Sequence, residues 1–206
     1  MSDEIYRRLA NLLDTLPNGF PKTRSGIEIK ILKKVFTPDE AELFCDLKLK
    51  PETADQIAKR TGRPLEGLED KLIAMRQRGE IQGYRYDGAW MFKLIPWIVG
   101  IFEFQLDRMD REFAQLCEEY SPYWGRQSLR YGPKLMQVVP VEKEIPAKQE
   151  ALTYQQVSNL IEKAVSFMVV ECICKKSQGL LDHPCKKPLE VCLAMAPIPG
   201  VFDNHP

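Results

Sequence analysis

The spacing of apolar residues predicts helices in the first third of the chain. A stripe with helical periodicity covers residues 3–16, and Pro17-Asn18-Gly19 ends it. Residues 20–36 are interpreted as a connector, because Ile27, Ile29 and Ile31 alternate with polar residues. Thr37 and Glu40 have the spacing of a capping box, so we expect a helix that begins after Thr37 and stops before Pro51.

The pattern from Thr37 to Leu94 predicts three helices followed by a hairpin. Thr53 is placed to cap a short second helix that ends at Thr61-Gly62, and a third, from about residue 64, ends at Arg78-Gly79. Residues 81–86 and 89–94 alternate like strands around an Asp87-Gly88 turn. This order resembles a winged-helix domain, particularly that of regulators of the multiple-antibiotic-resistance type, and the resemblance implies DNA binding as the first function to weigh.

The charges of this segment favour a docking role over DNA binding. From Thr53 to Leu94 eight basic residues stand against six acidic ones. The start of the expected recognition helix carries Glu66, Glu69 and Asp70, where base and phosphate contacts would be made. Since affinity for DNA depends largely on neutralising phosphates, the sequence argues against DNA as a partner.

A second apolar stripe predicts one helix of about five turns over residues 102–120, ending at Ser121-Pro122. This stripe has two possible partners, a second copy of the chain or the helix's own domain. Winged-helix proteins often pair through a flanking helix, so a homodimer is expected through residues 102–120. The stripe consists of Phe102, Leu106, Met109, Phe113, Leu116 and Tyr120.

The C-terminal third is expected to be a linker followed by a separate module. Residues 121–152 are rich in proline and glycine, with a strand-like run at 135–141, and are interpreted as an ordered strap. Thr153 and Gln156 form a second capping-box pattern. The helix it opens is predicted to bury Val157, Leu160, Ile161, Ala164, Val165 and Met168.

Composition narrows the class of protein without identifying it. The 206 residues include 29 basic and 29 acidic ones, so no overall charge draws the chain to nucleic acid or to an anionic membrane. The longest uncharged apolar run, 94–102, is too short to span a bilayer, and the N-terminus lacks the layout of a signal peptide. We therefore expect a cytoplasmic protein, in which structural disulfides are rare.

Four of the six cysteines form the candidate site. Cys172, Cys174, Cys185 and Cys192 are spaced C-x-C-x10-C-x6-C, whereas Cys45 and Cys117 stand alone and are interpreted as inert thiols. A tight group of thiols in a reducing compartment favours a metal over a disulfide framework. Thiolates select zinc or iron–sulfur clusters. The irregular spacing suits a chain wrapped around a [4Fe–4S] cluster better than the paired spacing of zinc knuckles, and Zn²⁺ stays as the alternative.

The residues between these cysteines could support a metal. Lys175, Lys176, Lys186 and Lys187 outnumber Asp182 and Glu190, and their charge would offset that of four thiolates. His183, close to Cys185, could serve as a second-shell donor or, less readily, as a ligand. No Ser-His-Asp set and no phosphate-binding glycine motif is present, so an enzyme acting alone is not favoured.

Several segments resemble a family of iron–sulfur ferredoxin-like proteins of anaerobic bacteria and archaea. They are residues 6–10, 16–21 and 28–33 together with Cys172-Ile-Cys-Lys-Lys and Cys185-Lys-Lys-Pro-Leu-Glu-Val-Cys-Leu. The resemblance implies a winged-helix-like N-terminal part, a [4Fe–4S] cluster on the four cysteines, and electron transfer with a partner oxidoreductase. In that family further cysteine-rich ferredoxin modules typically follow. This sequence stops at Pro206 without the cysteine run of such a module. We therefore expect that it could be part of a longer chain.

The expected fold is mainly α with a small β component. Residues 1–120 are assigned to a winged-helix-like domain with flanking helices, 121–152 to the strap, and 153–206 to a helix plus a cysteine-rich metal-binding module. The leading functional hypothesis is an iron–sulfur electron carrier. A metal- or redox-sensing transcription regulator and a zinc-stapled structural adaptor are the alternatives.

Overall fold

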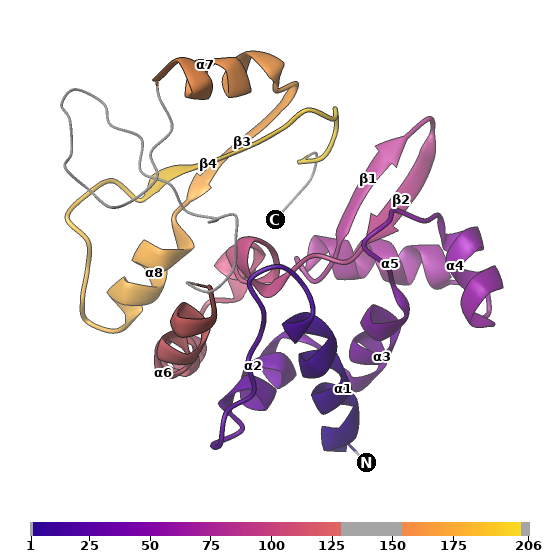
Figure 1. Cartoon of the computed structure of the whole chain (residues 1–206), viewed down its shortest axis with the longest axis horizontal. Helices are drawn as coiled ribbons and strands as arrows, with labels where there is room; N and C mark the ends of the chain where they lie inside the picture. Colours follow the sequence, from indigo (N-terminus) through magenta and orange to yellow (C-terminus); the bar gives the residue numbers. More distant parts are fainter. Residues whose placement is uncertain (1, 129–153, 203–206) are drawn as a thin grey trace.

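Helices build most of the molecule, with two small antiparallel sheets beside them (Figure 1). The computed structural model describes residues 2–128 and 154–202. Its first part contains α1 (Ser2–Asp14), α2 (Ile27–Val35), α3 (Pro38–Asp46), α4 (Ala54–Thr61), α5 (Leu68–Gln77), β1 (Gln82–Tyr86), β2 (Ala89–Lys93), the irregular turn η1 (Trp97–Ile101), the 3₁₀ helix η2 (Glu103–Arg108) and α6 (Arg111–Ser128). The second part contains α7 (Tyr154–Lys163), β3 (Ser166–Glu171), α8 (Ile173–Leu180) and β4 (Glu190–Ala196).

Local signals placed the helix starts and the hairpin correctly. Thr37 and Glu40 exchange both capping-box hydrogen bonds at the start of α3, and Thr53 caps α4 in the same way with Gln56. β1 pairs with β2 in antiparallel register from Gln82↔Lys93 to Tyr86↔Ala89. Asp87 and Gly88 both have positive φ, which is the conformation of a type I′ turn.

The connector predicted for residues 20–36 is wrong over its second half, because Ile27–Val35 is the helix α2. Ile27, Ile31 and Val35 are buried at intervals of four residues, which is a helical and not an alternating pattern. Gly26 begins the helix with φ 69°, a left-handed conformation that glycine adopts readily. Over the five residues from Ile27 to Ile31, the half-buried Ile29 between two buried isoleucines gives an alternating pattern that resembles a strand.

The single helix predicted for 102–120 is also wrong. Residues 103–108 form the 3₁₀ helix η2, and Met109 is extended. Asp110 then starts α6 afresh, since its carboxylate accepts a 2.7 Å hydrogen bond from the N–H of Phe113. α6 continues past Pro122 to Ser128, so the first part of the predicted strap is helical. The remainder of the strap, with the run at 135–141 and the Thr153 cap, lies outside the described residues.

The apolar stripe of residues 102–120 packs within its own chain. Met109, Phe113 and Tyr120 are buried in the main core. The hydroxyl of Tyr120 donates to the carbonyl oxygen of Pro21 at 3.0 Å, and its ring lies 4.9 Å from that of Phe20. α6 therefore packs on α2 and the segment before it, which is packing on its own domain, one of the two alternatives that the sequence left open.

The helix predicted from Thr153 to Met168 is wrong in its last third. α7 ends at Lys163, and residues 166–171 form the strand β3, which pairs antiparallel with β4. Leu160, Ile161 and Val165 are exposed instead of buried. A ladder whose partner lies about two dozen residues away leaves no signal in the local spacing, which explains the error.

One core joins the two described parts. It contains buried residues from α1 to α6 and also Ile173 of α8, which is 4% exposed. α8 lies against α6 in Figure 1, and Lys176 donates to the carbonyl oxygen of Leu106 in η2 at 2.7 Å. None of the described helices combines the length and the apolar character that crossing a bilayer takes.

Candidate functional site

The four candidate cysteines lie on three adjoining pieces of structure. Cys172 is the N-cap of α8, and Cys174 lies in its first turn. Cys192 lies in β4, and Cys185 lies in the loop that joins α8 to β4. All four are free thiols. The fold thus brings both ends of the C-x-C-x10-C-x6-C segment back to the start of α8.

Hydrogen bonds between β3 and β4 hold Cys172 beside the strand that carries Cys192. Val170 is the register partner of Cys192, and a bulge follows where Glu171 pairs with Glu190. Just beyond the ladder, the N–H of Cys172 donates to the carbonyl oxygen of Leu189 at 2.8 Å. The backbone therefore keeps the two cysteine-bearing segments side by side without a metal.

Three of the thiols share one electrostatic environment. Burial, together with the neighbouring Cys172, Glu103 and Cys192, raises the pKa of Cys174 to about 11. Burial likewise raises the pKa of Cys192, with added contributions from Cys172 and Glu103. The first turn of a helix would normally favour a thiolate, but burial outweighs that effect at Cys174. A metal that bound here would have to displace protons.

Cys185 does not join this group. It lies in the loop between α8 and β4, is exposed like Cys174, and is not among the neighbours that raise the pKa of Cys174 and Cys192. Across residues 2–128 and 154–202, no three side chains of His, Cys, Asp or Glu are placed so that they could hold a metal ion. Cys172, Cys174 and Cys192 are soft donors suited to zinc or iron and lie within electrostatic reach of one another, but they are not placed as a metal-binding group, and the fourth predicted ligand stands apart. The fit to a four-cysteine centre is therefore partial.

The lysines predicted to surround the site have two different roles. The ammonium of Lys175 donates to the carbonyl oxygen of Pro188 at 2.6 Å, and that of Lys176 bonds Leu106 of η2. Both lysines thus fasten α8, one to the loop before β4 and one to the N-terminal part. Lys186 and Lys187 are exposed in the loop beside Cys185.

His183 is exposed, and its backbone N–H closes the end of α8 by donating to Gln178 at 2.9 Å. The structure shows no contact between its ring and a candidate cysteine among the described residues.

Glu103 is the neighbour of the cysteines that the sequence did not single out. Its carboxylate accepts a 2.7 Å hydrogen bond from the N–H of Gly100, and burial raises its pKa to about 7. It sits close enough to the thiols to raise the pKa of both Cys174 and Cys192. No local pattern could have revealed this, because Glu103 is about seventy residues from Cys174 in sequence.

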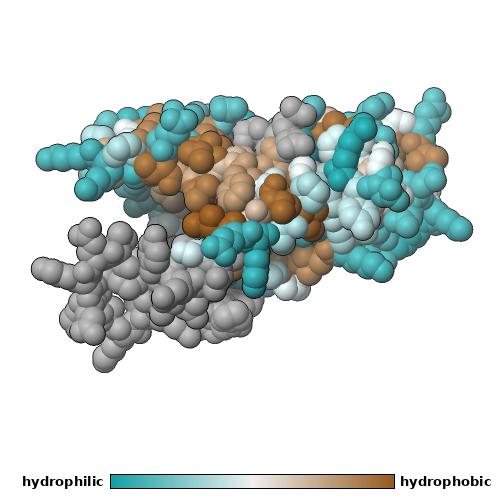
Figure 2. Space-filling view, turned by 90° about the horizontal axis from the view of Figure 1, so that it is seen from above, coloured by the Kyte–Doolittle hydropathy of each residue, from teal (hydrophilic) through white to brown (hydrophobic). Residues whose placement is uncertain are grey.

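An exposed apolar sheet face lies next to the cysteine segment. Figure 2 shows hydrophobic residues gathered over the half of the molecule that holds α7, β3 and β4. Among the described residues, nine of the fourteen exposed large hydrophobic ones fall between residues 160 and 198. Phe167 and Val169 on β3, with Val191 and Leu193 on β4, are each about half exposed. Patches of this kind often mark protein–protein contacts.

Several positive charges of the segment from α3 to β2 are held in ion pairs. Arg60 pairs with Glu52 at 2.6 Å, and Arg63 pairs with Asp46 at 2.7 Å. Lys71 pairs with Asp39, Arg78 pairs with Glu40 and Glu80, and Arg76 is buried. α5 begins at Leu68 and not near Pro64, so Glu69 and Asp70 form its exposed first turn. These pairings and carboxylates reduce the charge that this segment offers for neutralising phosphates.

Comparisons with known proteins found no matching family model, no curated protein and no solved structure with significant similarity. The geometry and chemistry of this chain therefore carry the functional argument alone.

Proposed function

We propose that the chain is an iron–sulfur protein that passes electrons to or from a partner oxidoreductase. The observation that carries the proposal is the convergence of Cys172, Cys174 and Cys192 around the start of α8, with Cys185 in the loop that links α8 to β4. The C-x-C-x10-C-x6-C spacing and the cysteine motifs shared with ferredoxin-like proteins support the same assignment.

In this proposal each part of the cysteine segment has a defined task. The β3–β4 ladder and the Cys172–Leu189 hydrogen bond position three thiols in advance. The loop around Cys185, which contains Pro184 and Pro188, then brings the fourth thiol inward, and the ammonium groups of Lys186 and Lys187 offset the thiolate charge. A bound [4Fe–4S] cluster would supply reversible one-electron chemistry.

A surface beside the cysteines supports a role that involves a partner protein. The apolar face of β3 and β4 offers a contact area next to the proposed redox centre. No nucleotide-binding motif or catalytic triad accompanies the site in the sequence, which favours a carrier over a self-sufficient enzyme.

The order α3, α4, α5, β1, β2 supports a winged-helix assignment for residues 37–94, and we assign it a docking role. An isolated antiparallel bridge between Glu52 and Phe92 places the segment before α4 beside the hairpin, which supports the same assignment. The ion pairs of Arg60, Arg63 and Lys71 argue against DNA. A transcription regulator would bind one operator about a thousandfold more tightly than random duplex. We expect no specific binding at low salt.

The test is reversible reduction of the reconstituted protein. Anaerobic loading with iron and sulfide should give a brown protein whose visible absorption bleaches with dithionite and returns on air-free oxidation. The Cys174→Ala variant should lose this signal, and Cys117→Ala, on α6, should keep it. A colourless product that binds only zinc would support the structural adaptor instead.

A further inference from the structure

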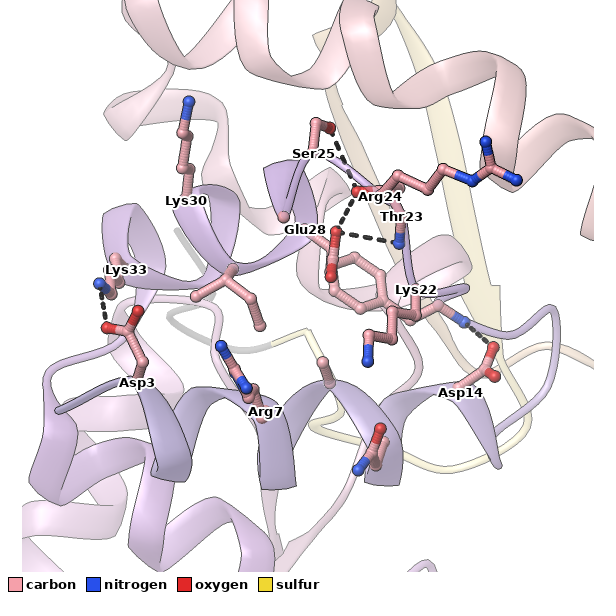
Figure 3. A pocket seen from close by; sticks show the side chains of 15 residues that line it. Asp3, Arg7, Asp14, Lys22, Thr23, Arg24, Ser25, Glu28, Lys30 and Lys33 are labelled. Carbon is pink, nitrogen blue, oxygen red and sulfur yellow. Dashed lines mark hydrogen bonds and ion pairs between the residues drawn. The ribbon is translucent and has the colours of Figure 1, made fainter. Parts of the chain in front are cut away.

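A cavity of about 530 Å³ lies between α1 and α2, and none of its lining residues belongs to the cysteine site. Its walls come from α1, from the segment that joins α1 to α2, and from α2 itself (Figure 3). The volume is within the range of pockets that hold small organic ligands.

Positive charge is in excess around this cavity. Its lining includes five cationic side chains and three carboxylates: Arg7, Lys22, Arg24, Lys30 and Lys33 against Asp3, Asp14 and Glu28. Each carboxylate already has a partner. Asp3 pairs with Lys33 at 2.6 Å, and Asp14 accepts from the N–H of Phe20 at 2.9 Å. Buried Glu28 accepts from the N–H of Thr23 at 3.2 Å.

Two of the cations point into the cavity without a carboxylate of their own. Arg7 on α1 and Lys22 in the connecting segment both direct their charged ends into the space between the helices (Figure 3). Within the described ranges neither has an ion-pair partner, in contrast to the neighbouring Arg8, which pairs with Asp46. Lys30 and Arg24 also line the cavity, but their side chains point away from it (Figure 3).

The remaining walls favour an anion that has an organic part. Ser25 and Gly26 bring the start of α2, with the positive end of its dipole, to the cavity, where the N–H of Ile27 already donates to the hydroxyl of Thr23 at 3.2 Å. Ile29, which is half-buried, supplies apolar surface, and Phe20 lies fully buried behind it. Guanidinium and ammonium groups beside a helix start are typical ligands of a phosphate group.

We propose that this cavity binds the phosphate group of a small phosphate monoester, with Arg7 and Lys22 contacting the phosphate and the apolar side chain of Ile29 contacting the organic part. The site is independent of the proposed electron transfer, since it shares no residue with the cysteine segment.

The test is calorimetric titration of the full chain with phenyl phosphate, inorganic phosphate and phenol, with chloride keeping the ionic strength constant. Phenyl phosphate should bind most tightly, because it alone satisfies both the cations and the apolar wall. Equal affinity for inorganic phosphate would overturn the monoester assignment. Absence of binding by either phosphate above the chloride background would overturn the site.

Charge-reversal variants separate a built site from general attraction. Arg7→Glu and Lys22→Glu should each weaken phenyl phosphate binding about tenfold or more, because each removes a charge-assisted contact. The matched control Lys30→Glu makes the same charge change on a lining residue that points away, and it should leave the affinity within about threefold. Equal losses in all three variants would overturn the proposal. Arg7→Gln and circular dichroism check that a loss does not come from unfolding.

Discussion

The backbone N–H of Cys172 donates a 2.8 Å hydrogen bond to the carbonyl oxygen of Leu189. This bond extends the β3–β4 pairing to the residue at which α8 begins, so the two ends of the segment formed by α8 and the following loop are hydrogen-bonded to each other. Cys172 and Cys192 lie at this paired end, and Cys185 lies in the loop. In the proposed site, the loop therefore has to bring Cys185 to the other three thiols.

Metal binding should protect Cys185 from alkylation. In the metal-free protein we expect iodoacetamide to modify exposed Cys185 first and Cys117 last, because burial raises the pKa of Cys117 to about 12. After anaerobic reconstitution Cys185 should become as unreactive as Cys174, as peptide mass mapping would show. Continued rapid labelling of Cys185 in the loaded protein would remove it from the ligand set.

The contact between α8 and the N-terminal part should depend on apolar burial more than on charge. Ile173→Ala should lower the free energy of unfolding by about 2–4 kcal/mol, since Ile173 is buried in the shared core. Asp182→Ala breaks the 2.5 Å ion pair with Arg111, but both side chains are more than half exposed, so we expect a loss below about 0.5 kcal/mol. Urea titrations compare the two, and equal losses would contradict this account.

Replacing Phe113 with Glu should unfold the protein instead of separating a dimer. Phe113 is 2% exposed in the core between α6 and α2, so a carboxylate there would be buried without a partner. Gln115→Glu places the same charge at an exposed position of the same helix and should leave the thermal unfolding curve unchanged. A folded Phe113→Glu monomer, seen by light scattering beside a dimeric parent, would restore the homodimer expected from the sequence.

Elements that depend on neighbouring residues could be predicted from the sequence. The capping box at Thr37, the N-cap at Thr53 and the Asp87-Gly88 turn depend on residues within a few positions of one another, and all three occur as expected. Features set by distant partners could not. The strand β3 depends on β4, and the break at Met109 depends on how η2 and α6 each pack on α2 and α8.

In the candidate site, too, the features set by nearby residues could be predicted and those set by distant residues could not. The C-x-C pair and the later cysteines are visible in the sequence, and the fold brings three of them together. Glu103 enters the site only because η2 packs beside α8, and the separation of Cys185 from the other thiols depends on the path of a loop that contains two prolines.

Stability should fall as the pH rises through neutrality because of Glu80. This carboxyl is fully buried, and burial raises its pKa to about 7 in spite of its ion pairs with Arg78 and Arg108. A folded-state pKa above the unfolded value stabilises the protein at low pH, and this contribution is lost as the pH rises through about 7. Glu80 alone should lower the free energy of unfolding by at most about 3 kcal/mol between pH 5 and 8.

The Glu80→Gln variant should have a flatter dependence of stability on pH than the parent. Glu103 also has a pKa of about 7, so part of the slope should remain and should disappear in the Glu80→Gln/Glu103→Gln double variant. Urea unfolding at pH 5.5 and pH 8.0 measures the difference. An unchanged slope in Glu80→Gln would show that the ion pairs keep Glu80 ionised throughout.

Metal analysis after anaerobic reconstitution tests the central claim most directly. The full chain is offered iron, sulfide and zinc together, and bound metals and acid-labile sulfide are counted per chain after desalting. The account predicts about four iron and four sulfide per chain with little zinc, and loss of iron in Cys172→Ala. One zinc per chain with no iron or sulfide would contradict it.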